Sequence, residues 1–458
     1  MQNTAASRNR FGFSVRVALA VGATFAAFAL AACSSSSASG GGKYGFKEAK
    51  QSPSAQITVW IDSTRQPAAD AYKKAYPNDP VKVVTYDGEA NGSGSFKTKM
   101  NLYDKAGSGW PDVVFSSQNN DASWASQGTN GAQAYAAVLN KGLVADNTLS
   151  GWSKGSLDAC TVNGQVYCLR NDLAQDVLWY NKTLMDQFGY TVPKTWEDYL
   201  ALGDKVAQDH PGYIIGAVGD TFAEEIYMWS SQCQANDVTG VRKITINTNS
   251  TGCAQMAALL DKEIANKSVT TDSVFTPEFV KAYTGKVLMM PGPAWYAGAI
   301  FDNKSSLNVP AGQIGVAAPP SWGTNAPVTG DVGGGTWFIS SHSKNLALAA
   351  KFAEFVTTND AYQVDQAPGY PAFASAGTKW LAKQQSSGYY ATDLSAITTA
   401  GGEVWSGWGA PTFSQEAIWA KTMTPVITSG GSIAANLGKW QTAIANQAKV
   451  DGYTVSTS

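Results

Sequence analysis

The chain has 458 residues, of which 15% are charged and 44% are hydrophobic, and this composition is typical of a globular protein with a sizeable core. At roughly 100–200 residues per domain, the length predicts two or three domains. The formal net charge of −2 argues against nucleic acid as the main partner, because phosphate binding needs a basic face. Only two histidines occur, His210 and His342, which excludes a metal site built from several histidines.

The first 32 residues have the pattern of a secretory signal peptide. They contain Arg8, Arg10 and Arg16 but no Asp, Glu or Lys, and an apolar or small run, Val17–Ala32, follows the arginines. This run is too short for an ordinary membrane-spanning helix, which needs about 20 apolar residues. Cleavage of this segment would leave 30 basic and 35 acidic residues, a net charge of −5.

The end of this run resembles a bacterial lipobox. Leu30-Ala31-Ala32-Cys33 precedes four serines, and the resemblance implies that Cys33 is lipidated and becomes the new N-terminus. The alternative is an ordinary signal peptide with a chance cysteine. Residues 34–54 are rich in Ser, Gly, Lys and Gln, which predicts a flexible tether. We therefore expect an extracytoplasmic protein held at the cell membrane by its lipid alone, with residues 33–54 as anchor and tether.

Residues 55–120 alternate predicted strands and helices. The strands are expected at 57–61, 81–86 and 113–115, and the helices at 68–75 and 96–106. This alternation predicts βαβ units with a parallel sheet, and ligands bind such sheets beyond the carboxyl ends of the strands. The polar segments 62–65 and 116–120 follow the first and third strands, so they either line a ligand site or form ordinary polar loops.

Four cysteines remain beyond the leader. Cys160 and Cys168 flank a short predicted hairpin, and Cys233 and Cys253 form a second local pair. Four cysteines permit three pairings, and proximity in the sequence favours these two. An oxidising compartment makes disulfides the default. A metal site is the alternative, although the spacings contain no CxxC.

The later part of the chain carries further strand and helix signals and no internal repeat. Strands are expected at 177–182, 287–290 and 333–339. We expect Thr195 to cap a helix that begins at Trp196, and Ser343 to cap a helix that contains Leu346.

Two catalytic motifs occur in a context that does not favour catalysis. Residues 151–155 match GxSxG around Ser153, but a hydrolase elbow needs a strand before the serine, and residues 145–150 have the composition of a loop. Residues 341–344 match SxxK but coincide with the expected start of a helix. A secreted glycosidase, which needs two opposed carboxylates, is the main alternative to a non-enzymatic protein. A structural or adhesive lipoprotein is a third reading.

The order of several motifs resembles that of the bacterial extracellular solute-binding proteins of the carbohydrate-uptake class, which includes the maltose-binding proteins. The motifs are ITVW, GWPDVVF, NGQVYCL, LWYNKTLMDQFGYTVPKTWEDY, GKVLMMPGPAW, GGGTWFISSHSKN and GYPAF. The resemblance covers about residues 55–450. Its most specific element is the block that begins with YNK and ends with the TW pair, and the block from GGG to SKN is second.

The resemblance implies an α/β, two-lobed periplasmic-binding-protein-like fold of type II, in which each lobe is a sheet flanked by helices. The chain would cross the hinge several times, with lobe 1 at 55–172 plus 333–370 and lobe 2 at 173–332 plus 371–458. It also implies a monomeric receptor that closes on a mono- or oligosaccharide and docks on the permease of an ABC importer. Separate subunits would hydrolyse ATP, and this chain has no GxxxxGK[ST] loop. No cofactor and no catalysis are expected.

A sugar site needs aromatic plates for the ring faces and amides, carboxylates or arginine for the hydroxyl groups. The resemblance, taken motif by motif, gives the ligand-binding candidates Thr64, Arg65, Asn119, Asn120, Gln175 with its neighbours Asp172 and Asp176, Tyr227, Trp229, Trp295, Trp405 and Trp408. Amides stand at 119 and 120 where the family places an acid and a base, which leaves the identity of the sugar open. Arg65 is alternatively a surface charge, and Tyr227 and Trp229 are alternatively buried aromatics. The several tryptophans favour an oligosaccharide.

Replacing Cys33 by alanine tests the lipid anchor. Cys33→Ala removes the only thiol that a lipobox could modify, so the protein should leave the membrane fraction and lose the mass of the lipid. Cell fractionation and intact mass spectrometry measure both effects. A variant that stays in the membrane fraction at unchanged mass would contradict lipidation at Cys33.

Overall fold

The computed structural model describes residues 42–128 and 132–457. The predicted signal peptide and lipidation site lie outside these residues. In the described ranges, no helix has both the length and the apolar composition needed to cross a membrane.

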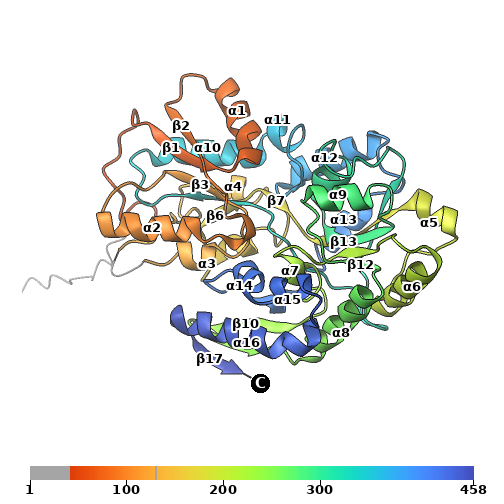
Figure 1. Cartoon of the computed structure of the whole chain (residues 1–458). Coiled ribbons are helices and arrows are strands. Elements are labelled where there is room, and N and C mark those ends of the chain that lie inside the picture. The colour runs from red at the N-terminus through yellow and green to blue at the C-terminus, as the bar shows by residue number, and fades with distance from the viewer. Residues whose placement is uncertain (1–41, 129–131, 458) are drawn as a thin grey trace, which may run out of the picture. The chain divides into compact units, whose positions relative to one another are not determined.

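Four strands from residues 57–170 and one from residues 336–339 build a five-stranded sheet in the order β2-β1-β3-β15-β6 (Figure 1). This sheet and its helices form the first part of the structure. The strands β1, β2 and β3 are parallel, as the alternating pattern predicted, whereas β15 is antiparallel to both β3 and β6. The strand bounds are β1 Ile57–Ile61, β2 Val81–Thr85, β3 Val113–Ser116, β6 Cys168–Arg170 and β15 Thr336–Ile339. The helices of this part are α1 Gln66–Ala75, α2 Ser95–Ala106, α3 Ala122–Ala125, α4 Asp146–Leu149, α10 Leu346–Thr358 and α11 Asp360–Gln363.

Three small sheets and many helices form the second part. The sheets have the orders β13-β8-β14, β10-β11-β17 and β12-β9. Their strands are β8 Asp176–Asn181, β9 Gly216–Ala217, β10 Gln234–Gly240, β11 Lys243–Asn247, β12 Val269–Thr270, β13 Met289–Pro293, β14 Ile314–Ala317 and β17 Thr454–Thr457. The helices are α5 Lys182–Phe188, α6 Trp196–Asp209, α7 Ala223–Ile226, α8 Thr251–Ala265, α9 Pro277–Tyr283, α12 Ala374–Ser386, α13 Ser395–Ala400, α14 Gln415–Thr422, α15 Thr424–Thr428 and α16 Ile433–Val450. Helix α16 packs on α8 and on the sheet that contains β17 (Figure 1).

The buried hydrophobic residues divide into two separate clusters. One draws on residues 57–169 and 337–372, and the other on residues 177–332 and 370–453. We call these the first core and the second core. Each stabilises the elements that enclose it, because burial of apolar surface contributes roughly 25 cal/mol per Å². Between them the chain pairs β7 Asp172–Leu173 with β16 Tyr370–Pro371.

The last residues of the predicted tether are fixed to the first part of the fold. The side chain of Gln51 donates to the carbonyl of Ser343 (3.0 Å) and accepts from the backbone of Leu346 (2.9 Å). The Asn345 amide donates to the carbonyl of Pro53 (3.0 Å). Residues 51–53 are therefore held in place rather than flexible, because they satisfy backbone groups at the start of α10.

The two predicted helix caps have different outcomes. The prediction for Thr195 is confirmed, since its hydroxyl accepts from the backbone N–H of Asp198 (3.0 Å). The prediction for Ser343 is wrong, because Asn345 caps α10 by accepting from the N–H of Leu348 (3.3 Å). Asn345 directly precedes the helix, which places its side chain within reach of the third helical N–H. Ser343 lies too early and accepts from the N–H of Asn345 instead.

Both predicted disulfides are present. Cys160–Cys168 closes the hairpin of β4 Thr161–Val162 and β5 Gln165–Val166. Cys233–Cys253 joins the segment before β10 to the first turns of α8. All four cysteines are fully buried. The proximity argument therefore selected the right pairing, because each pair is brought together by a local turn rather than by a distant contact.

Removing either disulfide should destabilise the protein. The closed loops have sequence separations of 8 and 20, for which the loss of loop-closure entropy in the unfolded chain predicts about 2–3 kcal/mol each. Urea unfolding of Cys160→Ser with Cys168→Ser, and of Cys233→Ser with Cys253→Ser, measures this. Mass spectrometry of an unreduced digest of the wild type checks the pairing, and free thiols or crossed pairs would contradict it.

Candidate functional site

A cavity of about 680 Å³ is lined by residues from both parts of the chain. Asn119 and Arg170 belong to the part that forms the first core, and Gln175, Trp229 and Trp405 to the part that forms the second. We call it the interlobe cavity. Four of the candidate residues, Asn119, Gln175, Trp229 and Trp405, therefore lie around one cavity although up to 286 residues separate them in the sequence.

A buried ion pair fixes the wall of the interlobe cavity. The Arg170 guanidinium, only 2% exposed, lies 2.7 Å from a carboxylate oxygen of Asp331. It also donates to the carbonyls of Asp172 (3.0 Å) and Gly333 (2.9 Å). The second carboxylate oxygen of Asp331 accepts from the N–H of Ala174 (3.1 Å). Removal of one partner would destabilise the protein, because it would leave the other charge buried and uncompensated.

The two asparagines after β3 join this wall to the opposite side. The Asn119 amide donates to the carbonyl of Asp331 (2.7 Å). The Asn120 amide donates to the carbonyls of Pro411 (2.8 Å) and Phe413 (2.9 Å). Asn119 lines the interlobe cavity and Asn120 does not. In this conformation Asn120 serves as a bridge between the two parts of the chain.

Thr64 and Arg65 do not line the interlobe cavity. The Thr64 hydroxyl donates to Asp62 (2.7 Å), and the Arg65 guanidinium lies 3.5 Å from Asp62 and 4.0 Å from Asp172. The guanidinium also lies over the ring of Phe115, 4.2 Å from its centroid. Arg65 is thus not a free surface charge, because two carboxylates and an aromatic face surround it, and its contact with a ligand stays a prediction.

The tryptophans form a layered group beside the interlobe cavity. The rings of Trp229 and Trp408 stack with centroids 5.3 Å apart and an angle of 11°. The Trp229 indole donates to the carbonyl of Trp405 (2.7 Å). Trp408 is buried behind this group, whereas Trp405 is half-buried and lines the interlobe cavity with Trp229. The indole of Trp405 is therefore the flat surface best placed to meet a ligand.

Two predicted aromatic contacts lie away from the interlobe cavity. Tyr227 is fully buried in the second core, and its ring centroid lies 6.3 Å from that of Trp196. It is therefore a buried aromatic residue, which was the alternative to a ligand contact. Trp295 is half-buried, donates to the carbonyl of Val332 (2.9 Å) and stacks against Phe275 with centroids 6.1 Å apart. Aromatic neighbours occupy the face that would otherwise meet a sugar, so a stacking role for Trp295 stays a prediction.

Gln175 carries an unsatisfied acceptor at the interlobe cavity. Its side chain is 1% exposed, and its Nε2 donates to the carbonyl of Ile397 (2.5 Å). Its Oε1 is buried without a hydrogen-bond partner among the described residues. A buried acceptor left without a donor costs about 1–3 kcal/mol.

Four carboxyl groups lie close to the same wall: Asp176, Glu224, Glu225 and Glu416. The sequence patterns predicted a ligand contact only around Asp176 and indicated none of the three glutamates. All four are 6% exposed or less. Both oxygens of Asp176 and of Glu224 lack a hydrogen-bond partner within the described ranges. The adjacent acids Glu224 and Glu225, shortly before Trp229, were the feature of the sequence that could have indicated a buried polar cluster. Acidic residues are seldom fully buried unless they are paired.

Burial and mutual repulsion raise the pKa of these carboxyl groups. Burial, then repulsion from Glu416, raises the pKa of Glu224 and Glu225 well above the usual range. Burial, then the charge of Asp331, does the same for Asp176. Burial raises the pKa of Glu416 to about 7, although Gln118 donates to its carboxyl group (3.1 Å). Among the described residues no cluster of His, Cys, Asp and Glu has the arrangement of a metal site.

Glu416→Gln should make the protein more stable at neutral and alkaline pH. A carboxyl group with a raised pKa favours the folded state below its ordinary pKa of 4.5 and loses that contribution as the pH rises toward 7. The amide keeps an acceptor for Gln118 and carries no charge. We expect the free energy of unfolding at pH 8 to rise by about 1–3 kcal/mol and to depend less on pH between 4.5 and 8.

Urea unfolding between pH 4 and 8 measures this effect. Glu278→Gln is the matched control, because Glu278 is exposed on α9, and surface changes of this kind stay within about 0.5 kcal/mol. Equal behaviour of the two variants at pH 8 would show that Glu416 carries no buried charge.

Comparison with known proteins identifies a family that matches most of the chain. The family described as "Bacterial extracellular solute-binding protein" matches residues 56–363. An arabinooligosaccharide-binding protein of Halalkalibacterium halodurans is 20% identical over 299 residues, which are 64% of this chain and 64% of that relative. The chain thus spans less than two thirds of the length of this relative.

Solved structures show the same fold. A binding protein associated with an ABC transporter of B. animalis subsp. lactis, in complex with β-1,6-galactobiose, superposes with a TM-score of 0.71 at 21% identity, over 88% of this chain and 99% of that one. The galacto-N-biose/lacto-N-biose I-binding protein of Bifidobacterium longum gives 0.69 at 20% identity, over 89% and 100%. The predicted two-lobed, type II periplasmic-binding-protein fold is confirmed. Because the family match covers more than half of the sequence, the chain belongs to the bacterial extracellular solute-binding protein family.

Proposed function

We propose that this protein is an extracytoplasmic receptor that binds an oligosaccharide in the interlobe cavity and delivers it to the permease of an ABC importer. The single observation that carries the proposal is the combination, in one cavity of about 680 Å³, of a half-buried indole at Trp405 with the unsatisfied acceptor of Gln175. Family membership supports the same role.

The chemistry of a sugar matches this cavity. A pyranose ring presents weakly apolar C–H faces, which an indole covers, and hydroxyl groups, which need acceptors and donors. The carboxyl groups of Asp176 and Glu224, close to the wall, have oxygens that lack partners among the described residues. Hydrogen bonds to such groups form without further desolvation cost, because folding has already removed their water.

The relatives support a short glycan as the ligand. One binds arabinooligosaccharides according to its name, and the two solved structures hold the disaccharides β-1,6-galactobiose and lacto-N-biose. The proposed lobes are residues 55–172 plus 333–370 and residues 173–332 plus 371–458. In their favour, the two hydrophobic cores draw on nearly the same ranges, and a ligand would bring such lobes together by hinge closure.

Membrane attachment through Cys33, a monomeric state and the absence of catalysis also belong to the proposal.

The segment around Ser153 argues against a hydrolase. Ser153 follows Trp152, which forms only an isolated bridge to Phe373 and is not part of a strand. The elbow that exposes a catalytic serine needs a strand before it and a helix after it. Lys154 and Ser156 from this segment line the interlobe cavity, where they are available for hydrogen bonds.

A thermal-shift and calorimetric screen of the protein without its leader against di- and oligosaccharides tests the function. A ligand at a hundredfold excess over its Kd should stabilise the fold by about 2.7 kcal/mol. Trp405→Ala should weaken binding of the same sugar by about 1–3 kcal/mol, since it removes one aromatic plate. Trp110→Ala is the matched control, because Trp110 is half-buried in the first part and stacks on His342.

Two results would overturn the proposal. No stabilisation by any sugar would contradict the sugar receptor. Release of shorter products from an oligosaccharide would favour the glycosidase, because a receptor returns its ligand unchanged.

A further inference from the structure

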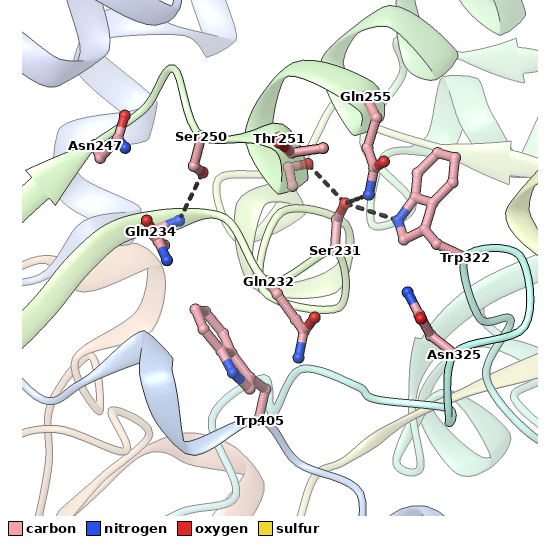
Figure 2. Close-up of a pocket in the computed structure, with 11 residues that line it drawn as sticks. Ser231, Gln232, Gln234, Asn247, Ser250, Thr251, Gln255, Trp322, Asn325 and Trp405 are labelled. Carbon is pink, nitrogen blue, oxygen red and sulfur yellow. Dashed lines mark hydrogen bonds between the residues drawn. The ribbon is translucent and has the colours of Figure 1, made fainter. Parts of the chain in front are cut away.

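A second cavity, of about 610 Å³, opens on the side of the second core (Figure 2). Its walls are the turn 231–234 after α7, the first turns of α8, and the loop that carries Trp322 and Asn325. Trp405 closes it on one side. We call it the outer cavity, and none of its lining residues comes from the part of the chain that forms the first core.

The outer cavity has the composition of a neutral sugar site. Its eleven lining residues include amides, hydroxyls and two tryptophans but no charged side chain. The amide groups of Gln232 and Asn325 point into the space between the indoles of Trp322 and Trp405 (Figure 2). Planar amides and indoles are the groups that recognise the hydroxyls and the faces of an uncharged pyranose. A phosphate or a uronic acid would instead need a cation.

The walls of the outer cavity are held in place before any ligand arrives. The Cys233–Cys253 disulfide ties the turn that carries Gln232 to α8. The Trp322 indole donates to the Ser231 hydroxyl (2.8 Å), which in turn donates to the carbonyl of Gly252 (2.7 Å). A Cβ at Gly252 would meet the carbonyl oxygen of Ser231 at 2.1 Å, so the glycine permits this close approach. A prearranged site loses less entropy on binding.

Gln232 adopts a left-handed backbone conformation with φ of 57°. This conformation is uncommon for residues other than glycine and costs free energy. It persists at the lip of the outer cavity, where it aims an exposed amide between the two indoles.

Trp405 connects the outer cavity with the interlobe cavity, because this residue lines both. A glycan chain that leaves the interlobe cavity across Trp405 therefore enters the outer cavity and meets Trp322 on the far side. Trp322 is half-buried and is supported from behind by Trp196, with ring centroids 6.3 Å apart.

We propose that the outer cavity is an additional subsite for the further residues of a neutral glycan whose other end lies in the interlobe cavity. This inference rests on the proposed function and deepens it, since it makes the ligand longer than a disaccharide. Trp322 and the amides of Gln232 and Asn325 would contact only the residues of the glycan beyond Trp405.

Isothermal titration with linear malto-, xylo- and arabino-oligosaccharides, each series running from the disaccharide to the hexasaccharide, tests the subsite. In a series that binds, affinity for the wild type should rise with chain length. Trp322→Ala should lower the affinity for the longest glycan on the order of tenfold and leave that for the shortest bound glycan unchanged. Trp405→Ala should weaken all lengths, and Trp110→Ala none.

Gln232→Ala is the second variant, because the side chain of Gln232 is exposed and its removal leaves the packing of the core unchanged. It should reduce the affinity for the longest glycan severalfold, while its melting temperature matches the wild type. If the wild type, Trp322→Ala and Gln232→Ala bind every length equally, the outer cavity is not a subsite although the receptor function stands. If no series binds to the wild type, both the receptor function for these neutral glycans and the subsite are overturned.

Discussion

The buried ion pair between Arg170 and Asp331 is the interaction on which the rest of the structure depends. It joins the end of β6 to the segment just before β15, and it reaches Asp172 through a backbone carbonyl. These are places where the chain passes from one core to the other. A Cβ at Gly334, whose φ is 73°, would lie 2.2 Å from the Arg170 guanidinium. Glycine at this position therefore leaves the space that the arginine side chain occupies. Removal of either partner would leave the other charge without its counterion at these crossings, which is strongly destabilising.

The crossings hold an electrostatically unusual wall between the two cores. Asp176, Glu224, Glu225 and Glu416 are buried with raised pKa values and few partners. A purely structural region rarely keeps such groups, since each unsatisfied atom costs free energy. Their burial therefore lowers the stability of the protein unless their oxygens gain hydrogen-bond partners.

The tryptophans organise the same region from the other side. Trp408 and Trp229 stack on each other, and the carbonyl of Trp405 accepts from the Trp229 indole. This hydrogen bond holds the backbone of Trp405, a residue that lines both the interlobe cavity and the outer cavity. One residue thus links two cavities of different character. The first has buried carboxyl groups close to its wall, and the second is lined by uncharged side chains and anchored by a disulfide.

The amino-acid sequence by itself determined what depends on neighbours along the chain: the parallel strands β1, β2 and β3, the Thr195 cap, the two disulfides and, through its motifs, the family. It also named Gln175, Trp229 and Trp405, which lie at the interlobe cavity. Only the tertiary structure decided that Tyr227 is buried, that carboxylates surround Arg65, and that Glu224, Glu225, Glu416 and Asp331 gather between the cores. Periodicity and caps act over a few residues, whereas the burial and charge environment of a side chain are set by segments that are distant in the sequence and meet only when the lobes pack.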